Sequence, residues 1–430
     1  MRPSVKQVPG KKAKIILRRF KTLNGGWSFP YPFIHSRKGD GCYFYDIDGN
    51  VFLDFGSQIA SNPLGYNHHE LMKTIKEHTG RSPIKYAGQD FVIKEHLDLL
   101  EELTKITPKG LNAAFFINSG AEAVENAIKI CLRRRPGAKV GISFESAFHG
   151  RTLGALSLTN SKAVQKKNFF TFPIHRLPFH IEAGEKLKRI IEEEGGPDNV
   201  GFVVLEPIQG EGGYHVPEKQ MVKDIRNITK KYKIPFIVDE VQAGMGRTGK
   251  WWAHEHFSIS PDVMTSAKAL QVGAAIARRT YFPEAGAISS TWGGGSILDL
   301  ALGTAIIRII KKERLLSHIT KMGVYLREQL IELQSKAPIF NIRGFGLMQA
   351  FDVQSLQQRN NLIIECLRRG LVLLGCGKRG VRLIPPYIIT EREIDQAIEI
   401  IKLSVLRCLR PSFKHKGPIC QFVNCGREVS

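Results

Sequence analysis

The sequence predicts an α/β fold in which helices cover a mainly parallel sheet. Short strands that are apolar along their whole length alternate with amphipathic helices through the middle of the chain. Strands of this kind are buried on both faces, which is typical of parallel sheets with helices on each side. The chain of 430 residues is also long enough for a sizeable core and for roughly two or three domains.

The first strand–loop–helix unit lies at residues 113–132. Residues 113–117 form a short apolar run rich in aromatic side chains, which stops at Asn118-Ser119-Gly120. Residues 121–132 then carry Ala, Glu, Asn and Lys at helical spacing. This order predicts a buried strand, a tight loop and a helix.

The same unit recurs further along the chain. Residues 200–205 form an apolar strand that ends at Glu206-Pro207, and residues 220–232 form an amphipathic helix. Residues 234–238 are again largely apolar and end at Asp239. We therefore expect two buried strands of one parallel sheet, the first ending at Glu206-Pro207 and the second at Asp239.

The remaining elements suggest a second, smaller α+β region built from both chain ends. The pattern predicts helices over 297–310, 315–333, 357–369 and 392–406, and strands over 41–46, 51–53, 339–353 and 371–384. Residues 410–430 show no periodicity and receive no assignment.

Composition and charge exclude several classes of protein. Apolar residues make up 43% of the chain and charged residues 24%, which excludes disorder as the main state. No apolar run approaches the ~20 residues of a membrane span. The 62 Lys and Arg against 40 Asp and Glu give a net charge of +22, but the basic residues are spread along the chain without an aromatic-lined groove or a reading helix. We therefore do not expect nucleic acid as the main ligand.

Cysteine use indicates a reducing, cytoplasmic location. The seven cysteines are irregularly spaced and include no CxxC pair, which argues against disulfides and against a zinc module. The first 39 residues carry ten Lys or Arg and no Asp or Glu, as in a transit peptide, but Lys11 to Arg19 lacks the serines that such peptides show.

Three residues or loops could carry chemistry, although each also has a structural explanation. The Ser119-Gly120-Ala121 loop opens a helix, where free N–H groups and the helix dipole bind anions, but the same residues also serve as a plain cap. Asp239 ends a strand at the edge where ligands of α/β sheets collect, and it could pair with a protonated heterocycle or cap the next loop. Lys268 follows another strand-like stretch, and a Schiff-base role for it rests only on that position.

Five sequence motifs follow one another along the chain. They are Phe148-His149-Gly150-Arg151-Thr152, Glu206-Pro207-Ile208-Gln209-Gly210-Glu211-Gly212-Gly213, Asp239-Glu240-Val241-Gln242-Ala243-Gly244 with Gly246-Arg247-Thr248-Gly249, Ser266-Ala267-Lys268 and Ser290-Thr291-Trp292-Gly293-Gly294. In this order they resemble the class III (ω-amino acid) aminotransferases, which are pyridoxal phosphate enzymes of fold type I. The resemblance extends over roughly residues 41–406. Within the family it is similar to the branch of L-lysine 6-aminotransferase and eukaryotic-type 4-aminobutyrate aminotransferase.

The resemblance implies a role for each matching residue toward pyridoxal 5'-phosphate. Lys268 corresponds to the Schiff-base lysine, Asp239 to the partner of the pyridinium nitrogen, and Gln242 to the side chain near the phenolic oxygen. The other implied cofactor contacts are Phe148, which stacks on the ring, Ser119, Gly120 and Ala121 at the phosphate, and Thr291, which reaches the phosphate of the other subunit of a homodimer with shared sites.

The resemblance also implies how the substrates bind. Arg151 corresponds to the arginine that holds the substrate carboxylate, and Glu211 and Arg382 to a pair that opens and closes between half-reactions. Ile59 lies in the Ser57–Ser61 motif of the branch and is included among the substrate contacts. The implied reaction moves the terminal amino group of 4-aminobutyrate or L-lysine to 2-oxoglutarate.

The implied architecture is a seven-stranded, mainly parallel sheet domain with a smaller α+β domain. We expect an N-terminal arm and part of the small domain at 1–75, the large cofactor-binding domain at 76–318, the rest of the small domain at 319–410 and a tail at 411–430.

Two departures and two alternatives accompany this interpretation. Ala267 precedes the lysine where many relatives have Ser, and Ala269-Leu270-Gln271-Val272 follows it where they have a glycine-rich stretch. The Gln271-Val272 pair resembles the lysine branch more than the aminobutyrate one. Ser119 and Glu122 stand in the places of the cysteines that hold an iron–sulfur cluster in animal 4-aminobutyrate enzymes, so we expect no metal. A racemase of the same family would use the same cofactor residues. An ornithine or acetylornithine aminotransferase is the other alternative.

Overall fold

The computed structural model describes residues 1–25, 31–80, 85–88, 90–289, 293–408 and 413. The chain forms two compact units, which we describe separately. The terminal unit comprises residues 1–68 and 317–430, and the middle unit comprises residues 69–316. The predicted domain boundaries, 75/76 and 318/319, lie seven and two residues further along the chain and stay a prediction.

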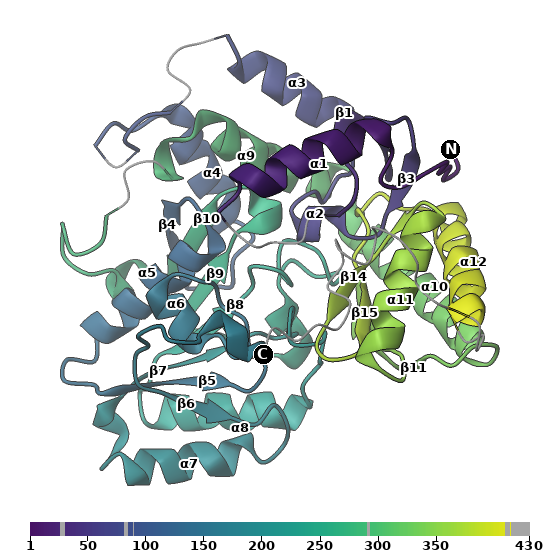
Figure 1. The fold of residues 1–430 in the computed structure, drawn as a ribbon. Helices are drawn as coiled ribbons and strands as arrows, with labels where there is room; N and C mark the ends of the chain where they lie inside the picture. The colour runs from purple at the N-terminus through teal and green to yellow at the C-terminus, as the bar shows by residue number, and fades with distance from the viewer. Residues whose placement is uncertain (26–30, 81–84, 89, 290–292, 409–412, 414–430) are drawn as a thin grey trace. The chain divides into compact units, whose positions relative to one another are not determined.

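A seven-stranded sheet forms the centre of the middle unit (Figure 1), in the order β4-β10-β9-β8-β7-β5-β6. Strand β10 runs antiparallel to both of its neighbours, and the other pairs are parallel. The predicted α/β class with a mainly parallel seven-stranded sheet is therefore confirmed. The strands are β4 (Ala113–Ile117), β5 (Val140–Phe144), β6 (Ile174–Leu177), β7 (Val200–Leu205), β8 (Phe236–Asp239), β9 (Val263–Ser266) and β10 (Gly273–Ala277).

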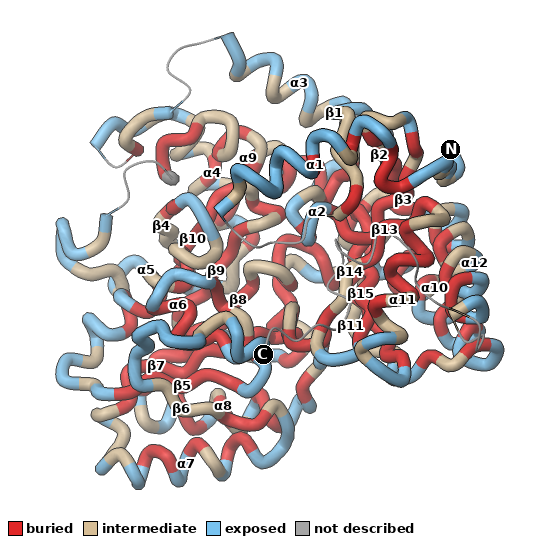
Figure 2. The backbone as a smooth tube through the Cα atoms, in the orientation of Figure 1, coloured by how far each residue is buried: buried red, intermediate tan, exposed pale blue. Residues whose placement is uncertain are grey.

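Helices pack on this sheet and bury its strands, as Figure 2 shows. Helix α5 packs against β7, β9 and β10, and its apolar side chains form one core cluster with residues of those strands. Every residue of β5, β7, β8, β9 and β10 is buried, which explains why those strands carry almost no charge. The helices of the unit are α3 (His69–His78), α4 (Lys94–Thr104), α5 (Gly120–Arg133), α6 (Leu153–Leu158), α7 (Ala183–Glu193), α8 (Lys219–Lys231) and α9 (Ile297–Lys312).

The terminal unit contains two four-stranded sheets, in the orders β1-β2-β3-β13 and β11-β12-β15-β14. Its strands are β1 (His35–Asp40), β2 (Tyr43–Asp46), β3 (Val51–Asp54), β11 (Phe340–Phe345), β12 (Met348–Asp352), β13 (Leu371–Val372), β14 (Leu374–Cys376) and β15 (Gly380–Leu383). Its helices are α1 (Lys11–Leu23), α2 (Ser57–Ala60), α10 (Leu315–Gln334), α11 (Leu356–Arg368) and α12 (Glu391–Cys408).

The single strands expected at 339–353 and at 371–384 are wrong, because glycine turns divide both runs. Gly346, with φ of 51°, lies in the turn that joins β11 to β12, and Gly377, with φ of 52°, lies in the turn between β14 and β15. A positive φ suits glycine, which has no Cβ to clash with the backbone. The tail at 411–430 lies outside the described residues, apart from Phe413.

Candidate active site

Ionisable residues follow three neighbouring strands of the seven-stranded sheet. Glu206 follows β7, Asp239 is the last residue of β8, and Lys268 comes two residues after β9. These strands are adjacent and parallel, so their carboxyl ends meet at one edge of the sheet. Ligands of α/β sheets bind at this edge.

Asp239 is buried, and both oxygens of its carboxylate have hydrogen-bond partners. Oδ1 accepts hydrogen bonds from the backbone N–H of Val241 and from the hydroxyl of Thr265, each at 3.0 Å. Oδ2 lies 2.7 Å from Nδ1 of His149, which is 3% exposed. Nδ1 must carry the proton to donate to a carboxylate. These bonds fix the position of the carboxylate at the end of β8.

His149 is a candidate site residue that was not predicted from the sequence, although it belongs to the Phe148–Thr152 motif. Its ring lies beside the carboxylate of Asp239. Its other ring nitrogen, Nε2, is buried and has no hydrogen-bond partner among the described residues. Its position in that motif, directly after the aromatic Phe148, is the sequence feature that could have identified His149 as a site residue.

The N-terminus of α5 lies beside both of the other motif loops. A Cβ built on Gly120 would come within 2.8 Å of Val241 and within 3.4 Å of Ala267, which precedes Lys268. Ser119 caps the helix by accepting a bond from the N–H of Glu122, and the first N–H groups of a helix have no partner inside it. The helix N-terminus can therefore bind an anion beside the loops that carry Asp239 and Lys268.

Lys268 has a strained backbone. Its φ is 34°, an uncommon value for a residue with a long side chain, and it opens a short 3₁₀ turn, η4 (Lys268–Leu270), that ends at Gln271 with φ of 69°. Lys268 is half-buried. Such strain persists where the surrounding structure holds it and is concentrated at functional sites.

Phe148 and Gln242 belong to loops at the same edge of the sheet. Phe148 is half-buried and directly precedes His149, and Gln242 lies three residues after Asp239. Gly150, with φ of 134°, packs so closely on the first turn of α5 that a Cβ there would lie 2.7 Å from Ala121. The loop of Phe148 thus lies against the N-terminus of α5.

The residues that the resemblance assigns to substrate binding belong to different units. Arg151 is exposed and Glu211 half-buried, and both belong to the middle unit. Arg382, on β15, and Ile59, in α2, belong to the terminal unit. Thr291 lies outside the described residues.

The turn that carries Ile59 is strained and tightly held. Ser57, Gln58, Ile59 and Ala60 all have φ between 43° and 68°, a left-handed turn that residues other than glycine rarely form. The buried carboxylate of Asp54 accepts hydrogen bonds from the N–H groups of Gly56 and Ser57 at 2.8 and 2.9 Å. Ile59 itself remains 47% exposed.

Glu206 joins two loops of the site. Its Oε1 accepts a hydrogen bond from the N–H of Phe148 at 2.9 Å, and its Oε2 accepts one from the N–H of Gly210 at 2.8 Å. Burial raises the pKa of Glu206 to about 7, while the charge of His149 lowers it and that of Asp239 raises it. Glu206 was likewise not among the site residues predicted from the sequence.

Glu206 should make the stability of the apo-protein depend on pH. The native carboxyl keeps its proton up to about pH 7, while an unfolded glutamate loses it near pH ~4.3. The native state binds more protons between these values, so the free energy of unfolding falls as pH rises, by up to about 1.4 kcal/mol per pH unit. Urea unfolding of Glu206→Gln across pH 4.5–7.5 should lack this slope. The exposed Glu145→Gln should keep it, and equal slopes in both variants would contradict the expectation.

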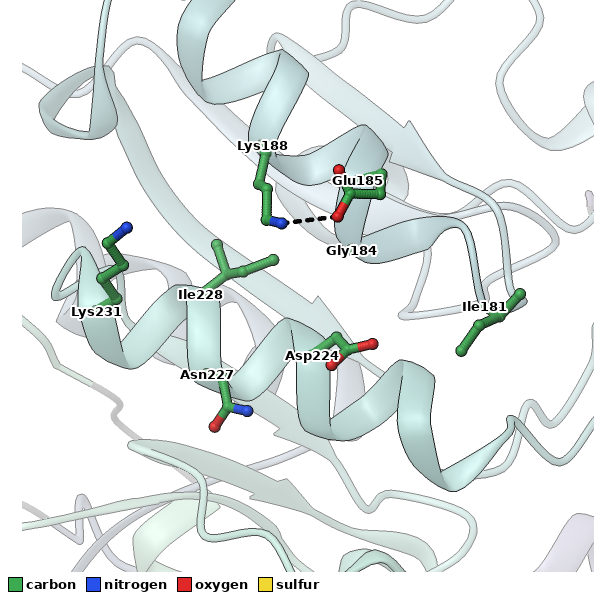
Figure 3. A pocket seen from close by; sticks show the side chains of 8 residues that line it. All are labelled: Ile181, Gly184, Glu185, Lys188, Asp224, Asn227, Ile228 and Lys231. Atoms are coloured by element: carbon green, nitrogen blue, oxygen red, sulfur yellow. Dashed lines mark hydrogen bonds and ion pairs between the residues drawn. The ribbon is translucent and has the colours of Figure 1, made fainter.

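A groove elsewhere in the middle unit contains none of the motif residues. It lies between α7 and α8, has a volume of about 310 Å³ and is shown in Figure 3. Lys188 donates to Glu185 of the same helix at 2.7 Å. The groove is lined by Ile181, Gly184, Glu185, Lys188, Asp224, Asn227, Ile228 and Lys231.

The edge of the sheet fits a phosphorylated, protonated heterocycle. The N-terminus of α5 can hold a phosphate, and the buried carboxylate of Asp239 can hold a protonated ring nitrogen. Behind Asp239 lies the ring of His149, whose Nε2 has no hydrogen-bond partner in the part of the chain that the structure describes. Lys268 offers an amine, so the residues present fit pyridoxal phosphate.

Comparison with known proteins identifies the family. The profile of the aminotransferase class-III family matches residues 28–405. An acetylornithine aminotransferase from Archaeoglobus fulgidus is 36% identical over 85% of this chain and 93% of its own length. A 4-aminobutyrate aminotransferase from Dictyostelium discoideum is 33% identical over 92% of this chain and 89% of its own length.

Solved structures agree with the sequence relatives. The lysine aminotransferase from M. tuberculosis in its internal aldimine form superposes with a TM-score of 0.85 and 28% identity, over 94% of this chain and all of that one. The chain therefore belongs to the class III aminotransferases. It is a pyridoxal phosphate-dependent transaminase of fold type I.

Proposed function

We propose that this transaminase moves the terminal amino group of an ω-amino acid, such as 4-aminobutyrate or L-lysine, to 2-oxoglutarate. The products are a semialdehyde and L-glutamate. The observation that carries the proposal is the placement of Arg151. Arg151 is exposed and lies two residues after His149, which contacts Asp239. Its guanidinium can therefore bind a carboxylate at a distance from the buried Asp239–His149 pair.

The names of the relatives support a terminal amine. 4-Aminobutyrate, lysine and acetylornithine, which appear in the names of the similar proteins, each carry a free amine at the end of the chain remote from the carboxylate. A donor held at Arg151 by its carboxylate would present that amine toward Lys268.

The residues at the sheet edge then divide the work. The backbone N–H groups of Ser119, Gly120 and Ala121 would bind the phosphate, Asp239 would bind the ring nitrogen, and Phe148 would cover the ring. Gln242 would donate to the phenolic oxygen. When bound, pyridoxal phosphate supplies the electron sink for the pair of electrons left as the substrate carbon loses its proton. Lys268 would hold the cofactor before the donor binds, and as a free amine afterwards it would move that proton as general base and acid.

The acceptor makes a different demand on the site, because 2-oxoglutarate has two carboxylates. We assign its α-carboxylate to Arg382, whose planar guanidinium suits a carboxylate with two parallel hydrogen bonds. Arg382 is 4% exposed, and a buried cation needs an anion beside it. We assign that role to Glu211 whenever the donor brings no second carboxylate.

Replacing Glu211 by Gln should change donor selectivity. An uncompensated Arg382 disfavours 4-aminobutyrate and the ε-amine of L-lysine, whereas L-glutamate brings its own α-carboxylate. Single-turnover rates should fall about 10- to 100-fold for the two ω-amine donors and far less for L-glutamate. The exposed Glu145→Gln serves as control. Equal losses for all three donors would show that Glu211 is a structural residue.

The assembly and the location are part of the same proposal. We propose a homodimer in which Thr291 of each chain completes the partner's phosphate site, acting in the cytoplasm on small-molecule substrates. The described cysteines, Cys42, Cys131, Cys366, Cys376 and Cys408, are free thiols, which suits a reducing compartment. In the described ranges no helix has the length and apolar character that a bilayer crossing requires.

A second candidate is an acetylornithine or ornithine aminotransferase, which the 36% identity to the Archaeoglobus fulgidus enzyme favours. Measuring L-glutamate formation from 2-oxoglutarate with 4-aminobutyrate, L-lysine, L-ornithine and N-acetylornithine separates the donors. We expect the highest kcat/KM with 4-aminobutyrate or L-lysine. Preference for N-acetylornithine would favour the second candidate. Incubation with one α-amino acid and no keto acid detects a racemase, which turns over, whereas a transaminase stops after one equivalent.

A further inference from the structure

The side-chain amide of Gln242 is held by a tyrosine from a different loop. The hydroxyl of Tyr214, on the loop after β7, donates to Oε1 of Gln242, on the loop after β8, at 2.8 Å. Because the carbonyl end of the amide takes this bond, the Nε2 end is left to donate elsewhere. The bond therefore decides which end of the amide is the donor.

A glycine of the same loop holds the amide from another side. A Cβ built on Gly210 would lie 2.8 Å from Nε2 of Gln242 and 3.1 Å from its Cδ. Any side chain at position 210 would displace the amide. Gly210 and Tyr214 thus fix both the place and the rotation of the Gln242 side chain.

The backbone of the loop is strained at Tyr214. Tyr214 has φ of 56° and is fully buried, and a bulky residue at positive φ is an outlier. The loop is closed around it by a bond from the N–H of Gln209 to the carbonyl of His215, at 3.0 Å. Strain of this kind, held by its surroundings, points to a functional constraint.

We propose that Tyr214 is a positioning residue that orients the Gln242 amide so that its N–H donates to the phenolic oxygen of pyridoxal phosphate. The proposal rests on the role assigned to Gln242 above. Without the hydroxyl the amide can turn over, and its carbonyl oxygen would then face another oxygen acceptor. The cofactor would lose a hydrogen bond and meet a repulsion in its place.

Tyr214→Phe tests the proposal, since it removes the hydroxyl and keeps the ring. Apo-protein is titrated with pyridoxal phosphate, and the dissociation constant and the absorbance maximum of the bound cofactor are followed against pH. We expect binding about three- to tenfold weaker, the effect of one lost hydrogen bond, and a shifted pH dependence of the absorbance. Tyr232→Phe, at the opposite edge of the sheet after α8, should change neither.

The decisive comparison is a double-mutant cycle with Gln242→Ala. If Tyr214 acts through Gln242, Tyr214→Phe should change cofactor affinity and absorbance little in the Gln242→Ala background. The thermal midpoint of the apo-protein is measured for every variant, so that a loss of stability is separated from a loss of orientation. Equal effects of Tyr214→Phe in the unmodified protein and in the Gln242→Ala background would overturn the proposal. So would unchanged cofactor affinity and absorbance when Tyr214→Phe is made in the unmodified protein.

Gly210→Ala provides a second variant should Tyr214→Phe fold poorly. It leaves the hydroxyl in place but pushes a methyl group against Nε2 of Gln242. We expect the same direction of change in affinity and absorbance, and unchanged values would count against the proposal. A wrong assignment of the amino donor would appear only in the donor comparison, because none of these titrations contains a donor.

Discussion

Lys268→Ala is expected to lower turnover by about 10⁴-fold or more while leaving the fold intact. With the role proposed for Lys268, the substitution removes both the amine that holds the cofactor and the group that moves the substrate proton. Lys268 lies just beyond a fully buried strand and is itself only half-buried, so the loss of its side chain opens no large core cavity. Steady-state rates at saturating donor and acceptor measure the effect.

A matched control for Lys268→Ala is Lys250→Ala, an exposed lysine in the same unit. It should retain the rate of the unmodified enzyme. Circular dichroism and the thermal midpoint should be similar for both variants. If Lys268→Ala kept a normal rate, its assignment would be wrong.

Asp239→Asn should retain some cofactor but lose about 10²- to 10³-fold in rate. An amide cannot hold a ring nitrogen protonated as a carboxylate does, so the substrate carbon loses its proton far more slowly. The amide also disturbs the contact with His149, because an Nδ2 group placed at the Oδ2 position offers a proton to a nitrogen that already carries one. Rapid-mixing measurement of deuterium loss from the labelled substrate carbon isolates this step.

The control for Asp239→Asn is Asp262→Asn, a carboxylate that pairs with Arg226 at 2.8 Å. Asp262 immediately precedes β9, at the opposite end from Lys268. That variant should lose stability and keep its rate per folded molecule. A near-normal deprotonation rate in Asp239→Asn would exclude the proposed role of Asp239.

The sequence was sufficient to predict the sheet and the ends of its central strands. The apolar runs at β7 and β8 have no helical periodicity, and each is followed directly by a carboxylate, so the pattern alone places Glu206 and Asp239 at strand ends. Strand β8 begins at Phe236, after Pro235, and includes Asp239 itself. These features depend on residues that are close in sequence.

The partners of those residues could not be predicted, because they are set by strand order. His149 reaches Asp239 across 90 positions, and Tyr214 reaches Gln242 across 28. Strand β5 pairs with β7, which pairs with β8, so the loops after β5, β7 and β8 meet, although nothing in a single sequence states that order. Glycine turns caused the errors in the terminal unit, since Gly346 and Gly377 interrupt runs that otherwise read as strands.

The central claim is that the terminal amine, and not an α-amine, is transferred to 2-oxoglutarate. L-Lysine and L-ornithine labelled with ¹⁵N at either the terminal or the α-position test it directly, with ¹⁵N in the L-glutamate product read by mass spectrometry. The proposed function predicts label in glutamate from the terminally ¹⁵N-labelled donor and none from the α-labelled one. Label in glutamate from the α-position would contradict it. So would a failure to form glutamate from all four donors, L-lysine, L-ornithine, 4-aminobutyrate and N-acetylornithine.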